Sequence, residues 1–183
     1  MPHIKPFIQV DENDVINGFF TFDGAVPAGP GTFVKVNVGF YGDWPAVINN
    51  PGAATYGNSY SPRWGVPSKV VPSNGSGDNV IGMLLYEVRE TDENGEKLTW
   101  NRKKAESNNW VISGEGCSIV TKGLFLYSGL QGIAAAGNIA YLGTAGQLNT
   151  SGSLDNHNVT KVGKFLGPSS TKSDNWVLFK LEL

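Results

Sequence analysis

The C-terminal segment alternates apolar and polar residues with a period of two. Apolar side chains recur at every second position up to the last residue: Val177, Phe179, Leu181 and Leu183. Such alternation is typical of a β-strand with one covered face. Because chain ends usually fray, a strand pattern that continues to the end indicates pairing within a sheet. We therefore expect a paired strand over 176–183 with its apolar row buried.

Similar patterns predict strands elsewhere. "TFVKVNV" alternates in the same way, and we expect a half-buried strand over 32–38. Short strands are also expected over 139–142 and 162–166. The stretch "WVISGEGCSIVTKGLFLY" predicts two strands over 110–127, with a β-bulge at Gly123, where the alternation changes sides.

A hairpin is predicted over 80–99, "VIGMLLYEVRETDENGEKLT". Its first strand places Leu84, Tyr86 and Val88 on one face, and the Asn94-Gly95 dipeptide is a strong hairpin-turn signal. The return strand would run through Leu98. The polar stretch that follows, "NRKKAESNN" at 101–109, is the one plausible helical turn.

The N-terminal region and the segment 39–79 contain prolines that disfavour regular secondary structure. Pro2 and Pro6 disfavour a helix or a central strand, so we expect residues 1–10 to form an extended arm that docks on a neighbour, or else a disordered tail. Segment 39–79 holds five prolines among many Gly, Asn and Ser residues, which predicts a long irregular insertion. We therefore expect an arm and lead-in over 1–22, followed by one β domain over 23–183.

Composition supports an all-β class. The 183 residues include 24 Gly and 10 Pro but only 16% charged residues, which suits many turns between short strands. The formal net charge is −2, so no basic field favours nucleic acid as a partner. No apolar run approaches the ~18 residues of a membrane span, and the N-terminus lacks a signal-peptide pattern. We expect synthesis in the cytoplasm and no membrane partner.

Few residues suggest catalysis. The two histidines, His3 and His157, are far apart in sequence, and a triad built on His157 and Asp155 lacks a recognisable serine setting. The single cysteine, Cys117, is expected to be a small buried side chain. "DENDVING" and "DENGEKL" resemble calcium loops but lack ligands at required positions, so they predict turns. We expect no enzyme, metal or cofactor, although two remote carboxylates of a glycoside hydrolase stay open as an alternative.

Aromatic residues gather in the predicted insertion. They either fold back over the domain or form an interaction surface, for a protein or for stacking sugars. These candidate interface residues are Trp44, Tyr56, Tyr60 and Trp64.

Several blocks resemble the decoration (cement) proteins of tailed-bacteriophage capsids, in the order found in that family. Four are C-terminal: "SGEGCSIVTKGLF" at 113–125, "AAGNIAYLGTAGQL" at 135–148, "KVGKFLG" at 161–167 and "NWVLFKLEL" at 175–183. Two lie upstream: "DGAVPAGPGTFVKV" at 23–36 and "DNVIGMLLYEV" at 78–88. Together they cover roughly half of the chain, and the segments 39–79 and 99–111 are additions to a minimal member.

The resemblance implies a compact β-barrel or β-tulip-like domain with loop insertions and an N-terminal arm. It also implies a non-enzymatic virion protein, commonly a homotrimer, that binds the major capsid protein on the outer surface of the expanded head. The arm residues expected to contact the capsid are Pro2, His3, Ile4, Lys5, Pro6, Phe7 and Ile8. The alternative is a carbohydrate- or receptor-binding module of a phage particle.

Overall fold

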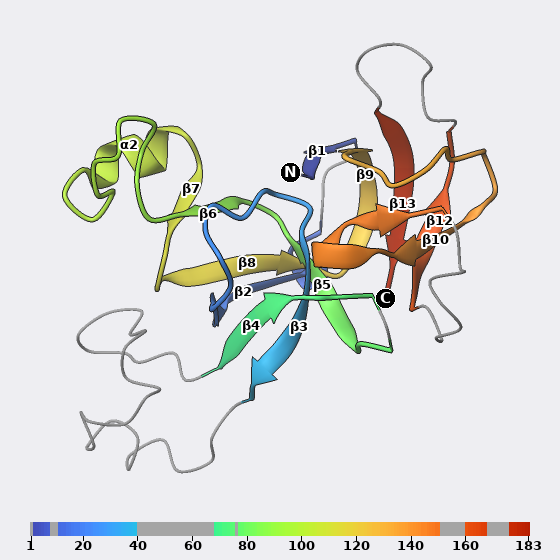
Figure 1. Ribbon diagram of the computed structural model, residues 1–183, viewed down its shortest axis with the longest axis horizontal. Helices are drawn as coiled ribbons and strands as arrows, with labels where there is room; N and C mark the ends of the chain where they lie inside the picture. The colour runs from blue at the N-terminus through green and yellow to red at the C-terminus, as the bar shows by residue number, and fades with distance from the viewer. Residues whose placement is uncertain (1, 8–10, 40–67, 76, 151–159, 168–175) are drawn as a thin grey trace.

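The computed structural model describes residues 2–7, 11–39, 68–75, 77–150, 160–167 and 176–183. These residues form a mostly β structure with antiparallel sheets and one short helix, which confirms the all-β class. Three parts lie in a row in Figure 1: a small excursion formed by residues 90–109 around the helix α2 (Arg102–Ser107), a ring of strands in the middle, and a larger sheet at the other end.

The first six strands are β1 (His3–Pro6), β2 (Val15–Phe22), β3 (Phe33–Val38), β4 (Lys69–Pro72), β5 (Val80–Leu84) and β6 (Glu87–Arg89). The others are β7 (Trp110–Ile112), β8 (Gly116–Val120), β9 (Lys122–Ser128), β10 (Ile139–Leu142), β11 (Leu148–Asn149), β12 (Lys161–Phe165) and β13 (Val177–Glu182). The helical segments are α2 (Arg102–Ser107) and the short 3-10 turns η1 (Glu12–Asp14) and η3 (Thr144–Gly146).

The larger sheet, sheet A, has the strand order β1-β9-β13-β12-β10-β11. The C-terminal strand β13 lies inside this sheet, between β9 and β12, as the alternation predicts. Val177, Phe179 and Leu181 are buried, whereas Leu183 follows the strand and is 39% exposed. The predicted apolar row therefore ends at Leu181.

An aromatic core fills the space under sheet A. The Phe179 ring lies 6.3 Å from Phe33, 6.4 Å from Tyr127 and 6.0 Å from Phe165, in tilted or edge-to-face geometry. Such arrangements add to the burial of the rings themselves. Phe33 belongs to the ring of strands, so this cluster joins the two β units.

The five strands β2, β4, β3, β5 and β8 close on themselves, because β8 pairs with both β5 and β2. Phe22, Val34, Val70, Leu84 and Ile119 are among its buried residues. Two of these strands differ from the sequence expectation. β2 lies in the predicted lead-in, and β4 lies in the predicted irregular insertion 39–79, where "KVVP" pairs with β3 and, in parallel, with β2.

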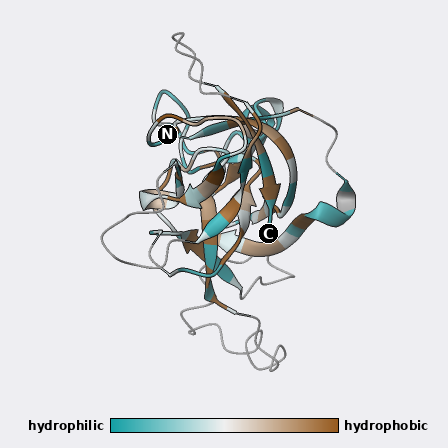
Figure 2. Cartoon of the chain, turned by 90° about the vertical axis from the view of Figure 1, so that its right-hand side faces the viewer, coloured by the Kyte–Doolittle hydropathy of each residue, from teal (hydrophilic) through white to brown (hydrophobic). Residues whose placement is uncertain are grey.

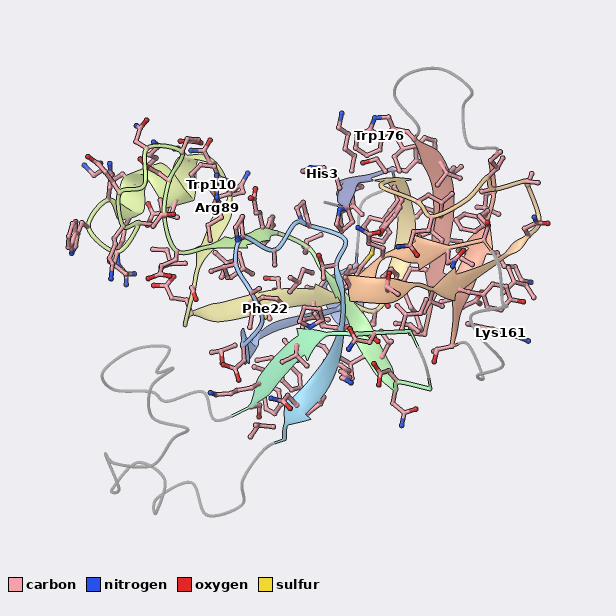
Figure 3. The ribbon with its side chains drawn as sticks, viewed as in Figure 1. His3, Phe22, Arg89, Trp110, Lys161 and Trp176 are labelled. Carbon is pink, nitrogen blue, oxygen red and sulfur yellow. The ribbon has the colours of Figure 1, made fainter. Side chains whose placement is uncertain are left out.

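The segment after β5 is also different from the prediction. The predicted turn at Asn94-Gly95 is confirmed, but it closes a short hairpin instead of a long one. This hairpin has a bridge between Thr91 and Lys97, and the Leu98 N–H donates to the Glu90 carbonyl at 3.0 Å. β6 then pairs in parallel with β7, and the Arg89 guanidinium stacks on the Trp110 ring at 4.5 Å (Figure 3). The predicted helical turn is confirmed as α2. The excursion therefore lies between β6 and β7 and contains both the short hairpin and α2.

The structure differs from the predicted strands in three places. Region 110–127 contains three strands, β7, β8 and β9, because residues 113–115 separate β7 from β8 and Thr121 carries the chain from the ring into sheet A. Gly123 pairs with Leu181 without a register shift, so it is no bulge. In β3, burial falls along the strand instead of alternating, and Val36 is 40% exposed. Figure 2 looks onto the side of sheet A and shows hydrophobic and hydrophilic positions mixed along its strands.

Candidate interaction surface

The N-terminal candidate residues lie at one edge of sheet A. His3 to Pro6 form β1, which pairs antiparallel with β9. Pro2 precedes this strand and is buried, and Phe7 follows it with 57% of its surface exposed. Ile8 lies outside the described residues. The segment is extended, as the prolines predict, but it forms an edge strand paired within its own chain instead of an arm or a disordered tail.

Ile4 anchors β1 to the core. It is 9% exposed and belongs to the core cluster of sheet A. A Cβ at Gly31 would lie 2.6 Å from the Ile4 Cγ2 and 3.2 Å from the Tyr127 ring, and Gly31 has a φ of +93°. Only glycine provides both that conformation and that space. Ile4 therefore fills a pocket of its own fold, not a pocket on a neighbour.

The flanking residues of β1 face outward and are held by further contacts. The Lys5 ammonium lies 4.8 Å from the centroid of the Trp176 ring, a cation–π contact between β1 and the residue before β13. The N–H of Phe7 donates to the Leu124 carbonyl at 2.9 Å. His3, Lys5 and Phe7 are thus accessible on a fixed strand.

The aromatic candidates Trp44, Tyr56, Tyr60 and Trp64 all lie outside the described residues. Sequence reasoning missed two exposed apolar side chains elsewhere: Trp100 and Ile133 are each 82% exposed. Trp100 lies in the excursion, directly before Asn101, which is the N-cap residue of α2. The exposure of Trp100 could be predicted from its position beside the polar stretch "NRKK", because a polar helix offers no apolar face to cover a tryptophan.

The described carboxylates with perturbed pKa values serve structural roles. In the turn after β6, Asp92 accepts hydrogen bonds from the N–H groups of Asn94 at 2.8 Å and Glu96 at 2.9 Å. Its second oxygen accepts from the Lys104 ammonium at 2.6 Å, and Glu93 lies 3.0 Å from the same ammonium. The Lys104 hydrogen bond is the main cause that lowers the pKa of both acids. This confirms "DENGEKL" as a turn.

A second network joins the ring to sheet A. Burial alone would raise the pKa of Asp78, but hydrogen bonds from Lys35, the Asn74 N–H and Ser73 lower it below its ordinary value. The Asp78 carbonyl accepts from the Thr160 hydroxyl at 2.9 Å, just before β12. A general acid needs a raised pKa, and the pKa values of Asp78, Asp92 and Glu93 all shift the other way.

The remaining candidates for chemistry are Cys117, His157 and Asp155. Cys117 is buried, as expected, its thiol contacts the Phe20 carbonyl at 3.2 Å, and burial raises its pKa to about 12. His157 and Asp155 lie outside the described residues. Among the described residues, no group of three or more His, Cys, Asp or Glu side chains is placed to hold a metal ion.

Comparisons with known proteins identify no family. No family model matches the chain, and no curated protein matches it. In the described part of the chain, no helix has the length and apolar character needed to cross a membrane.

Proposed function

We propose that the chain is a non-enzymatic capsid decoration protein of a tailed bacteriophage. The observation that carries this proposal is where the family-like blocks fall. The C-terminal blocks at 113–125, 135–148, 161–167 and 175–183 contain all or part of each strand from β8 to β13, and most of these strands pair in sheet A. The C-terminal part of the resemblance thus falls mainly on sheet A, and the upstream blocks at 23–36 and 78–88 contain parts of the ring strands β3 and β5.

The proposed mechanism is adhesion. A capsid that expands leaves seams between subunits, and a protein that spans a seam adds contact area on both sides. A standard interface of ~1,600 Å², repeated at each copy, stabilises a shell without any chemistry. The chain is proposed to sit on the outer capsid surface, with the major capsid protein as its partner and with a homotrimer as its assembly state. A β-tulip-like core is part of this proposal, supported by the ring of five strands.

The contacts with the capsid are proposed to come from β1 and from the loop aromatics. His3, Lys5 and Phe7 support the first, because they point outward from a strand that is already ordered. A preformed surface binds without the entropic cost of ordering a tail. Trp44, Tyr56, Tyr60 and Trp64 remain predictions for the second contact.

The test is co-sedimentation with heads of the phage that carries the gene. Purified chain is mixed with expanded, DNA-filled heads and with unexpanded heads, and the bound fraction is measured after centrifugation. We expect saturable binding to expanded heads only, at an occupancy that matches three-fold positions. Analytical ultracentrifugation of the chain alone tests for a trimer. Absence of binding to expanded heads would reject the function.

A carbohydrate-binding role is the second candidate, because Trp100 is 82% exposed. An exposed indole offers a flat apolar face on which a sugar ring can stack. Titration of tryptophan fluorescence with a glycan panel tests this role. A saturable change that Trp100→Ala removes would favour it over decoration.

A further inference from the structure

The outer face of sheet A can be traced from strand alternation. In β13 the residues Val177, Phe179 and Leu181 point into the core, so Leu178, Lys180 and Glu182 point outward. The pairing register extends this face across the sheet. Leu178 lies beside Leu126, and Leu126 lies beside Lys5.

The centre of this outer face is apolar. Leu124, Leu126 and Leu178 are half-buried neighbours on β9 and β13. Two more exposed apolar residues flank them at the ends of β1 and β12: Phe7 is 57% exposed and Leu166 is 45% exposed. The N–H of Leu166 donates to the Leu178 carbonyl at 2.8 Å, which places Leu166 against the same row.

Lysines surround these apolar residues. The outward positions of sheet A carry five lysines: Lys5, Lys122, Lys161, Lys164 and Lys180. The strands of sheet A hold only one acid, Glu182, which pairs with Lys180 at 3.4 Å. The whole chain is acidic, with 14 Lys and Arg against 16 Asp and Glu, so this clustering is local.

The arrangement of two lysines is unfavourable within the chain itself. Lys164 and Lys180 lie directly opposite each other on neighbouring strands. Like charges at such a pair destabilise a sheet, and the Glu182 carboxylate, 3.4 Å from the Lys180 ammonium, offsets only part of this repulsion. An external group of negative charge would relieve this repulsion.

We propose that the outer face of sheet A is the surface that docks on the capsid, and that it meets an acidic protein surface with an apolar centre. The inference rests on the proposed function for the identity of the partner. Leucines at the centre and charges around them match the usual anatomy of protein interfaces. Complementary charge would supply selectivity and a fast association rate.

Other occupants fit this face less well. Nucleic acid would require charge along the whole surface, whereas the centre here is leucine. A lipid surface would require apolar side chains that protrude at the centre of the face, where the three leucines are half-buried, whereas Phe7 and Leu166 protrude only at its flanks. A second copy docked through the same face would bring lysine against lysine.

The experiment compares two triple variants with the same change of charge. The face variant carries Lys122→Gln, Lys164→Gln and Lys180→Gln, on three strands of sheet A. The control variant carries Lys97→Gln, Arg102→Gln and Lys103→Gln, all exposed in the excursion. Binding to expanded heads is measured by co-sedimentation over a range of salt concentrations. We expect the face variant to lose about ten-fold in affinity and to show a shallower salt dependence, with the control within about two-fold of the original.

The outcomes separate the two proposals. If the unmodified chain binds heads and both variants bind equally, the docking face is wrong and the decoration function stands. If the unmodified chain binds no heads, both proposals fail together. Vesicles containing phosphatidylserine and a single-stranded DNA oligonucleotide serve as probes for other anions. Binding to either that the face variant loses, or a change in the mass of the isolated chain in the face variant, would also overturn the inference.

Discussion

The hydroxyl of Tyr127 accepts a hydrogen bond from the backbone N–H of Leu148, 3.1 Å away, across the core of sheet A. Tyr127 lies in β9 and Leu148 begins β11, with β13, β12 and β10 between these strands in the sheet. Both side chains are fully buried, and burial raises the pKa of the Tyr127 phenol. One hydroxyl thus ties an edge strand to a strand on the far side of the same sheet.

Tyr127→Phe should lower stability with little change of shape. The ring would remain, but the Leu148 N–H would lose its partner in a dry site, at a cost of about 1–3 kcal/mol. Urea denaturation measures this difference. Tyr86→Phe is the matched control, since Tyr86 is 41% exposed, and it should change stability by less than about 0.5 kcal/mol. Equal effects of the two variants would show that the hydroxyl of Tyr127 contributes nothing.

Ile4→Ala should be destabilising although it lies at the N-terminus. Loss of the buried side chain would leave a void between Gly31 and Tyr127, which typically costs about 2–4 kcal/mol. Thermal and chemical unfolding provide the measurement. Phe7→Ala, at a side chain 57% exposed, should have a much smaller effect. A stable Ile4→Ala protein would mean that β1 acts as the free arm that the sequence suggests.

Local pattern predicted the strands β9, β10, β12 and β13 of sheet A but not β1 or β11, and long-range pairing explains what it missed. β13 alternates clearly, so its own residues define it. β2, "VINGFFTF", has Gly18 at its centre and a register shift opposite β8, so its burial does not alternate. β4 has four residues and a final proline, and its partners are distant in sequence. Such strands exist only because the ring closes around them.

The sequence predicts only part of the candidate surface, because the rest depends on contacts between residues far apart in the chain. The two prolines predict an extended segment over residues 1–10 but do not identify its partner. Whether Ile4 points into its own core or into a neighbour depends on Gly31 and Tyr127, far along the chain. The lysines of sheet A belong to different strands, so only the register brings them onto one face.

The Asp92–Lys104 pair should make the excursion sensitive to pH. Because the folded pKa of Asp92 is lowered from 3.8, its contribution is fully present above that value and is lost as the pH falls through the lower folded pKa. The folded pKa of Lys104 is raised from 10.5, so its contribution is present below 10.5 and is lost as the pH rises through the higher folded value. Between these limits the pair should stabilise the turn at a constant level.

Asp92→Asn tests that window. The variant keeps the shape of the side chain but loses its charge, so its melting temperature should be lower than that of the original protein at neutral pH. The difference should shrink below pH 3.8. Glu106→Gln, an exposed carboxylate on α2, is the control. A difference that stays the same in acid would mean that the hydrogen bonds to Asn94 and Glu96 matter and the charge does not.

Gly163→Ala should disrupt the pairing of β12 with β13. A Cβ at this position would overlap the Lys180 carbonyl oxygen and approach the Phe179 ring to 2.8 Å. The backbone of two paired strands would have to separate, so we expect a loss of about 2–4 kcal/mol or failure to fold. Gly39→Ala, where no atom lies within 4 Å, should be near neutral. Soluble yield and melting temperature distinguish the two, and equal values would place the carbonyl of Lys180 elsewhere.

Cys117 should report on unfolding, because its thiol is hard to reach and hard to ionise. The thiolate is the reactive form, and a rise in pKa from 9.0 to about 12 lowers its fraction at pH 8 by about a thousand-fold. Dithionitrobenzoate should therefore label the native protein very slowly at pH 8 and label one thiol per chain at once in denaturing urea. As the chain has one cysteine, Cys117→Ser should abolish the signal. Fast labelling of the native protein would show that β8 opens readily from β2, and the ring of strands would then be far less stable than its buried core implies.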